Sequence, residues 1–221
     1  MLILLCAALV ACGVAVSARW HATRVDALGR ARPYPLLAAV CLELAALAAV
    51  PVVRITAEQH RLGRVATELA GAPATVHCQR LASAMADLTN DLGHVNLGQD
   101  GRPERSTLIK NEQCRLLGSY LASATVRRRP SYREVVAVHV LTHESMHMRG
   151  ITGEALAECA AVQRDQLTAE MLGATRDEAH LLALRYWLTV YPLMPDDYRS
   201  ADCGPGLPLD EHLPSAPWLR R

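Results

Sequence analysis

The sequence predicts a mainly α-helical domain with a small β-hairpin, preceded by one or two transmembrane helices. Hydrophobic residues make up 51% of the 221 positions, but aromatic residues only 4%, and Phe is absent. Ala, Leu and Val must therefore form most of the core, and this composition favours helices over a sheet-rich fold. Two apolar segments at the N-terminus, and apolar residues at helical spacing further along the chain, support the same class.

The two apolar segments, residues 1–17 and 35–53, approach the length of a membrane span. A helix needs roughly 17–25 residues to cross a bilayer. The loop between them, residues 18–34, holds four Arg and one Asp. Its positive charge places it in the cytoplasm. The remainder of the chain would then lie outside the cytoplasm, attached to the cell membrane.

An alternative interpretation starts the protein near Val25. Residues 30–50 would then form a signal peptide, with a basic stretch before the apolar one, and residues 35–53 would act as a signal or signal anchor instead of a second span. The two interpretations differ in the number of membrane passes. Both send the rest of the chain out of the cytoplasm.

The seven cysteines fall into two groups. Three lie in the apolar segments and are interpreted as small apolar residues. The other four are Cys78, Cys114, Cys159 and Cys203. Four cysteines in an exported domain predict two disulfides, with three possible pairings. We favour Cys78–Cys114 and Cys159–Cys203, because each joins neighbouring parts of the chain. A cysteine metal site is disfavoured, because the sequence has no Cys-x-x-Cys pair.

Residues 54–75 are predicted to form a juxtamembrane helix that serves as a stalk. A compact domain would follow over residues 76–221, close to the usual size of a single domain. Its first helix is expected over residues 78–93, where apolar residues recur at helical spacing. An Asp100–Gly101 turn between two short runs then predicts a β-hairpin. Asn111 is the expected cap of the next helix.

Three further helices are expected in the C-terminal half. They run from Ser131 to Gly150, from Glu154 to Leu172 and from Thr175 to Tyr191. The first and third begin with capping boxes, Ser131 with Glu134 and Thr175 with Glu178. The tail that follows is rich in Pro and Gly and is predicted to be irregular. A disulfide at Cys203 would anchor it.

The helix from Ser131 to Gly150 carries the pattern His-Glu-x-x-His at His143, Glu144 and His147. Residues four apart share one face of a helix, so the two imidazoles can bind one Zn²⁺. Glu144 lies one step round the helix, beside the metal, where it can deprotonate a zinc-bound water. Gly150 allows a sharp turn that returns the chain toward the metal.

The full pattern, H-E-x-x-H-x-x-G-x-x-x-E-x-x-x-E, resembles the zincin metallopeptidases. The glycine is similar to that of metzincins, although their third ligand, usually His, falls at Gly153 here. The Glu-x-x-x-Glu pair is more similar to gluzincins. The resemblance covers residues 138–159 only. Segments of small exported bacterial proteins of uncharacterised function are also similar.

The resemblance to gluzincins implies a role for each residue of the pattern. His143, His147 and Glu154 would bind the metal, and Glu144 would be the general base. Glu158 would orient a ligand imidazole. The separation between His147 and Glu154 is far shorter than in large gluzincins, so the connection must be a tight turn. If that turn does not bring Glu154 to the metal, Glu158 is the alternative ligand.

Other residues near the pattern have weaker support. His139 extends the histidine stripe by one turn and is expected to be a core histidine with a hydrogen-bond partner. Met194 resembles the methionine below a metzincin zinc. Tyr191 or Tyr198 could stabilise an oxyanion. Residues 94–97 could form an edge strand that holds a substrate in extended form.

Together these features predict a membrane-anchored or exported zinc-dependent peptidase acting on a peptide or protein. The first alternative is a non-catalytic, zinc-stabilised and disulfide-bonded domain that binds the cell envelope, with a protein ligand closing the fourth metal position. The second is a structural membrane protein in which the histidine stripe only packs. The net charge of +1 gives no indication of a nucleic-acid partner.

Overall fold

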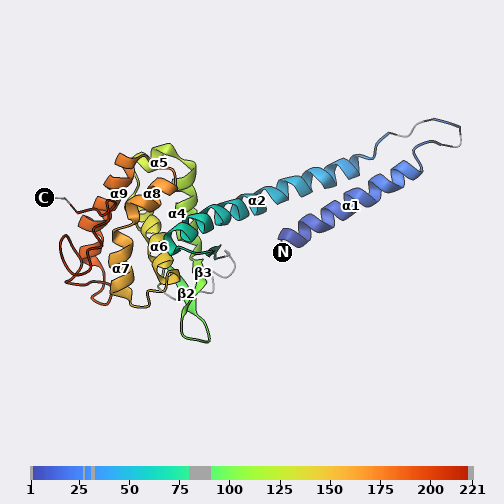
Figure 1. Cartoon of the computed structure of the whole chain (residues 1–221). Coiled ribbons are helices and arrows are strands. Elements are labelled where there is room, and N and C mark those ends of the chain that lie inside the picture. Colours follow the sequence, from blue (N-terminus) through green and yellow to red (C-terminus); the bar gives the residue numbers. More distant parts are fainter. Residues whose placement is uncertain (1, 27, 31–32, 80–90, 219–221) are drawn as a thin grey trace. The chain divides into compact units, whose positions relative to one another are not determined.

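A computed structural model describes residues 2–26, 28–30, 33–79 and 91–218 of the chain. The described part is mainly helical with one small three-stranded sheet, as the sequence predicted (Figure 1). It divides into two compact units, Met1–Glu58 and Gln59–Arg221.

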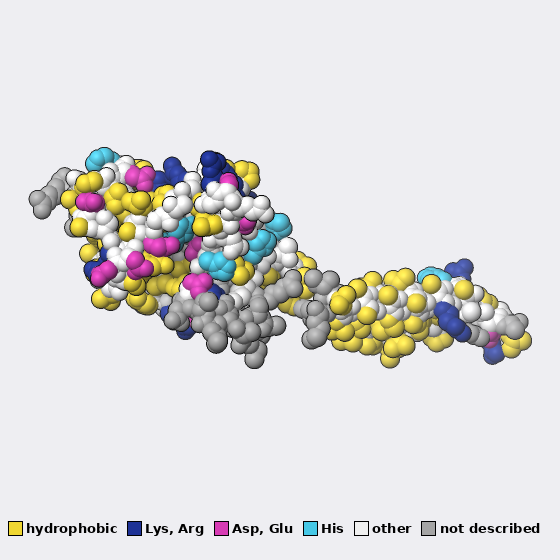
Figure 2. All heavy atoms as spheres, turned by 90° about the horizontal axis from the view of Figure 1, so that it is seen from below, with side chains coloured by type: hydrophobic (Ala, Val, Ile, Leu, Met, Phe, Trp, Pro, Cys, Tyr) yellow, Lys and Arg dark blue, Asp and Glu magenta, His cyan; other side chains and the backbone are white. Residues whose placement is uncertain are grey.

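The first unit consists of helix α1 (Leu2–Ala22) and the first part of helix α2 (Leu36–Ala70). Both helices are long and apolar enough to cross a membrane. Figure 2 shows that their surface is mostly hydrophobic, and Leu36 and Leu47 are 79% and 68% exposed. The Ser17 hydroxyl of α1 lies 2.6 Å from the hydroxyl of Tyr34, which precedes α2. A continuous apolar surface of this kind is stable in lipid but not in water.

The last turns of α2 belong to the second unit, which begins at Gln59. Their inward side chains are buried in its hydrophobic core: Leu62, Val65, Ala66 and Leu69. The compact unit therefore includes residues from the segment 54–75 that the sequence suggested as a stalk. The apolar spacing of this segment reflects packing against the domain.

A three-stranded sheet lies beside the helices of the second unit. Strands β2 (Gly93–Leu97) and β3 (Pro103–Ile109) form the predicted antiparallel hairpin, and Gly101 in its turn has a φ of +73°. Strand β1 (Thr75–Cys78), which the sequence pattern did not reveal, pairs in parallel with β3. The strand order is β1-β3-β2, so β2 is an edge of this sheet.

The helix expected over residues 78–93 falls mainly on residues 80–90, which lie outside the described part. Its first residue, Cys78, ends β1, and its last, Gly93, begins β2. Asn111 is the first helical residue of α4 (Asn111–Ala122), and Lys110 holds the cap position instead. The Asn111 side chain donates a hydrogen bond to the Gln79 carbonyl at 3.0 Å.

The remaining helices follow the expected order with one break. They are α5 (Ala124–Arg128), α6 (Tyr132–Met148), α7 (Glu154–Val162), α8 (Asp165–Met171), α9 (Arg176–Thr189) and the short 3-10 helix η1 (Tyr191–Leu193). Both predicted capping boxes are present, at Ser131 and Thr175. The single helix expected from Glu154 to Leu172 is interrupted at residues 163–164, which separates α7 from α8.

Helix α6 occupies the centre of the second unit and packs against α4, α7, α8, α9 and the β2–β3 hairpin (Figure 1). Two disulfides join Cys78 to Cys114 and Cys159 to Cys203, the pairing that the sequence favoured. The second ties the irregular C-terminal tail to α7. A disulfide of this kind contributes roughly 2–4 kcal/mol to stability.

Candidate metal centre

The tight turn between α6 and α7 brings the residues of the sequence pattern together. Gly150 adopts a φ of +109°, a conformation that favours glycine. Its N–H donates to the His147 carbonyl at 2.8 Å, and the Ile151 N–H donates to the Met146 carbonyl at 3.2 Å. These bonds end α6, and α7 begins at Glu154, its first helical residue. The short spacing that departs from large gluzincins therefore does bring Glu154 back to the histidines.

Three side chains, here called the outer triad, converge at this point: His143, His147 and Glu154. The Nε2 atoms of His143 and His147 are 2.9 Å apart. Glu154 Oε2 lies 3.1 Å from His143 Nε2 and 3.3 Å from His147 Nε2. Ligands at 2.0–2.1 Å from a tetrahedral zinc are separated by about 3.3 Å. The outer triad therefore has the dimensions of one face of a zinc site.

The hydrogen bonds of the two rings decide which nitrogens face the centre of the outer triad. His147 Nδ1 lies 2.7 Å from the Ile151 carbonyl, which can only accept, so this nitrogen carries the proton. His143 Nδ1 lies 3.0 Å from the carboxylate oxygen Oε2 of Glu158 and is likewise the donor. When the two rings are neutral, both Nε2 atoms are therefore unprotonated and each carries a lone pair. Two lone pairs and a carboxylate oxygen that converge on one point require a cation between them.

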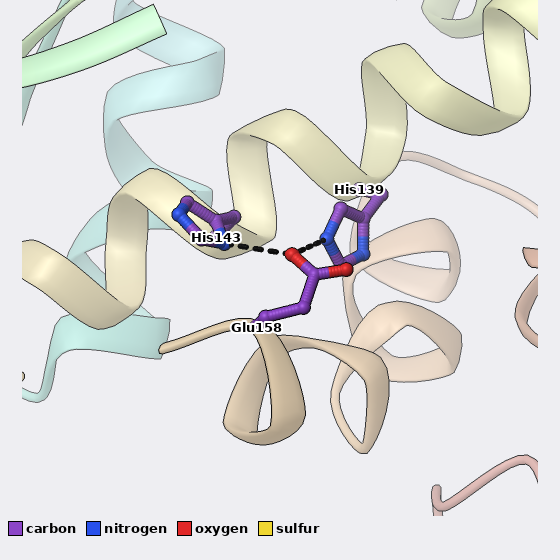
Figure 3. Close-up of side chains that lie close together, drawn as sticks. All are labelled: His139, His143 and Glu158. Atoms are coloured by element: carbon purple, nitrogen blue, oxygen red, sulfur yellow. Dashed lines mark hydrogen bonds and ion pairs between the residues drawn. The ribbon is translucent and has the colours of Figure 1, made fainter. Parts of the chain in front are cut away.

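Behind the outer triad lies a second group that shares His143. This inner triad consists of His139, His143 and Glu158 (Figure 3). Glu158 Oε2 lies 2.9 Å from His139 Nε2 and 3.0 Å from His143 Nδ1, and the dashed lines in Figure 3 mark both contacts. The other nitrogen of His139, Nδ1, lies 2.8 Å from Asp165 Oδ2.

Every contact of the inner triad pairs a donor with an acceptor. His139 lies between two carboxylates and donates from both nitrogens, so it is an imidazolium. Glu158 Oε1 accepts from the Tyr186 hydroxyl at 2.6 Å. No lone pair is left facing another in this group, so the inner triad needs no metal ion. The outer triad, which includes Glu154, is therefore the group that could hold a metal ion, and Glu158 is held by hydrogen bonds behind it.

The charges of the two triads shift the pKa values of their members. Burial alone would lower the pKa of His139, but the charges and hydrogen bonds of Asp165 and Glu158 outweigh it and raise this pKa to about 10. Burial is similarly outweighed at His143, where hydrogen bonds to Glu154 and Glu158 raise the pKa to about 9. Without a metal, a proton on His143 supplies the cation that the outer triad requires.

Glu144 occupies the place that the sequence predicted, beside the outer triad. Burial raises the pKa of its carboxyl to about 7, a suitable value for a group that takes and returns protons near neutral pH. The Thr107 hydroxyl of β3 donates to the His94 carbonyl at 3.0 Å, and its oxygen lies 3.4 Å from Glu144 Oε2. Gly93 of β2 packs against the same side chain, and a Cβ at that position would lie 3.0 Å from Glu144 Oε1.

A pocket of about 710 Å³ opens over these residues. Its lining includes the outer triad, Glu144 and the edge strand β2, and most of the remaining lining is apolar, as at Val136, Val140 and Met194. A volume of this size is typical of sites that take a small ligand or a short segment of chain. The fourth side of the outer triad therefore faces accessible space.

Of the two tyrosines considered, only Tyr198 lies at the site. Its ring is 5.7 Å from the His143 ring, and burial with the nearby charge of Glu154 raises its pKa to about 12, so it stays a hydrogen-bond donor. The Tyr191 hydroxyl accepts a hydrogen bond from the Ser200 N–H at 3.1 Å and is thereby occupied elsewhere. Met194 lines the pocket.

Two residues of this centre were not found by sequence reasoning. Asp165 begins α8 and Tyr186 lies on α9, and both contact the inner triad. The sequence feature that pointed toward them was His139, because its spacing from His143 indicated one more polar contact on the buried face of the helix. No spacing rule connects it to residues on two other helices.

Comparisons with models of known protein families, with curated proteins and with solved structures found no match for this chain. The interpretation of the site therefore rests on its own geometry and on the sequence pattern.

Proposed function

We propose that the protein is a zinc-dependent peptidase of zincin type, with its second unit outside the cytoplasm and its N-terminal helices in the membrane. One observation carries the proposal: three potential ligand atoms of the outer triad converge in the lining of the pocket, with the carboxyl of Glu144 beside them. Two imidazoles and one carboxylate are the ligand set of many catalytic zinc sites.

The roles of the residues follow from their positions. Zinc held by the outer triad would acidify a bound water and polarise a substrate carbonyl. Glu144 takes the proton from the attacking water and returns it to the leaving amine, for which a pKa of about 7 is well suited. Tyr198 donates a hydrogen bond to the developing oxyanion. The apolar pocket accepts a hydrophobic side chain, and the edge strand β2 pairs with an extended peptide.

The proposed location rests on the first unit and on the disulfides. Two apolar helices with exposed hydrophobic surfaces fit a membrane. Disulfides persist in oxidising compartments and are rare in the cytosol, so the two bonds of the second unit support an extracytoplasmic position.

A competing function is favoured by one contact. The Tyr198 hydroxyl is hydrogen-bonded to Glu154, and a hydroxyl at this place could close the fourth position of a metal held by the outer triad. The protein would then be a non-catalytic, zinc-stabilised domain that binds a component of the cell envelope. The two functions differ in whether the fourth position admits water.

The test uses the full chain in detergent, purified under oxidising conditions. Zinc content is measured by mass spectrometry, and cleavage is followed with a mixed peptide library. We expect one zinc per chain and cleavage before or after hydrophobic residues. Glu144→Gln should retain zinc and lose cleavage by about 10²–10⁴-fold. Glu104→Gln, an exposed acid on β3, is the matched control.

Stoichiometric zinc without cleavage by any preparation would favour the competing domain, and Tyr198→Phe should then open the fourth position. Absence of zinc from the oxidised wild-type protein would refute both functions.

A further inference from the structure

The inner triad is part of a longer buried chain of alternating carboxylates and imidazoles. This buried chain runs Asp165–His139–Glu158–His143, with contacts of 2.8, 2.9 and 3.0 Å. Its four members come from α6, α7 and α8, and its last member is a ligand of the outer triad. The proposed mechanism uses His143 but assigns no role to the two residues at the far end.

The three members of the buried chain that lie behind His143 are almost completely inaccessible to solvent. Asp165, His139 and Glu158 are 0%, 3% and 1% exposed. Burying charged groups is costly even when they are paired, and apolar residues of similar size often give equal or greater stability. A chain of charges at this depth is therefore poorly explained by stability alone. Its connection to a metal ligand offers a better explanation.

Each contact in the buried chain constrains the next. Tyr186 stacks on His139 with ring centroids 3.6 Å apart, which holds the plane of the imidazole. Asp165 Oδ2 accepts a hydrogen bond from His139 Nδ1, and Glu158 Oε2 accepts one from His139 Nε2. The Tyr186 hydroxyl holds Glu158 Oε1. With both of its oxygens held, Glu158 presents Oε2 to His143 Nδ1 and cannot rotate away.

The orientation of Glu158 in turn decides the state of His143. A carboxylate at Nδ1 keeps the proton on that nitrogen, so Nε2 is free to bind a metal, and it also increases the basicity of the ring. We propose that His139 and Asp165 are positioning residues of the metal centre, which hold Glu158 so that His143 keeps its metal-binding tautomer and orientation. This inference rests on the proposed metal site and extends it to residues that touch neither metal nor substrate.

The test measures zinc affinity instead of activity. The full chain in detergent is stripped of metal, and the dissociation constant for Zn²⁺ is measured by competition with a chromophoric chelator. His139→Gln keeps a hydrogen-bonding group but cannot bridge both carboxylates. Tyr186→Phe keeps the stacked ring and removes only the bond to Glu158. We expect His139→Gln to weaken zinc binding by about 10–100-fold, and Tyr186→Phe to weaken it less.

Leu117→Ala is the matched control, because Leu117 is fully buried on α4 and lies outside the buried chain. It should lower the melting temperature without changing zinc affinity. A second measurement, nitrogen NMR of labelled histidines in the zinc-loaded protein, reports the protonated Nδ1 of His143. Its proton signal should be sharp in the wild type and in Leu117→Ala, and lost or broadened in His139→Gln.

The outcomes separate this inference from the proposed function. If the wild-type protein binds zinc and both variants of the buried chain bind it within twofold as tightly, the positioning role is wrong while the metal site stands. If His139→Gln does not fold, Tyr186→Phe with the His143 signal decides alone. A wild-type protein that binds no zinc overturns the metal site and this inference together.

Discussion

The inner and outer triads share His143 and have nearly the same composition, yet they differ in what they require. In the inner triad each imidazole N–H meets a carboxylate oxygen, and the Tyr186 hydroxyl fills the last acceptor. In the outer triad two imidazole lone pairs and one carboxylate oxygen meet with no donor among them unless a ring is protonated. The first group is balanced, and the second needs a cation.

The difference shows why proximity of His and Glu side chains is not sufficient evidence for a metal site. Both groups bring ligand atoms within reach of one another. The partners behind each ring distinguish them: a carbonyl at His147 Nδ1 and a carboxylate at His143 Nδ1 turn the Nε2 atoms outward as acceptors. Exposure agrees, since the Glu154 side chain is 39% exposed and the Glu158 side chain is 1% exposed.

The largest effect is expected from removing Glu158, the acid of the inner triad. Glu158→Ala leaves the His139 imidazolium buried beside an empty space, which should lower the free energy of unfolding of the metal-free protein by about 3–5 kcal/mol. Glu158→Gln keeps the shape and one acceptor, and should cost less. Thermal unfolding followed by circular dichroism measures both. Equal stability of wild type and Glu158→Ala would mean that the inner triad is not an ion-pair network.

Removing Glu154, the acid of the outer triad, should instead lower zinc affinity and leave the stability of the metal-free protein nearly unchanged. Glu154→Ala deletes one of three ligands and should weaken zinc binding by about 10²–10³-fold, a share of the roughly 10–16 kcal/mol that zinc sites supply. The stability of the metal-free protein should change little, because Glu154 is partly exposed. Glu104→Ala controls for loss of an exposed acid. If Glu154→Ala retained zinc and Glu158→Ala did not, Glu158 and not Glu154 would be the metal ligand.

The pH dependence of zinc binding tests whether zinc replaces a proton on His143, the residue that the two triads share. The pKa of His143 is raised to about 9, so this ring is protonated at neutral pH in the metal-free protein. Zinc must displace that proton from Nε2. Below pH 9 the affinity should therefore rise by up to tenfold, about 1.4 kcal/mol, for each unit of increasing pH, and level off above it. Calorimetry in buffers of different ionisation enthalpy should detect about one proton released at pH 7.

A smaller effect is expected from the strand that supports Glu144. Gly93→Ala places a Cβ about 3.0 Å from Glu144 Oε1, which forces this carboxylate to move by a few tenths of an ångström. We expect zinc affinity to stay unchanged and kcat of the proposed peptidase reaction to fall several-fold, because proton transfer depends steeply on geometry. Gly98→Ala, in the hairpin loop, is a control at a distance from the site. Reduced zinc affinity in Gly93→Ala would show that the strand supports the ligands instead.

Most predictions with local determinants succeeded, although the expected cap at Asn111 was displaced by one residue. Capping boxes at Ser131 and Thr175, the Asp100–Gly101 turn and the stop at Gly150 each depend on a few adjacent residues, and all are present. The cysteine pairing also followed from chain order. Interpretations that depended on long-range packing were less complete, as with parallel strand β1, the break between α7 and α8, and the last turns of α2.

The sequence by itself determined that three histidines share one face of a helix and that a glycine turn returns two acids toward them. These are consequences of helical periodicity and of backbone freedom at one residue. Only the tertiary structure decided which acid completes each triad. That choice depends on the protons of two imidazole rings. The Gly150 turn places the Ile151 carbonyl at one ring, and packing brings Asp165 and Tyr186 to the groups that hold the other.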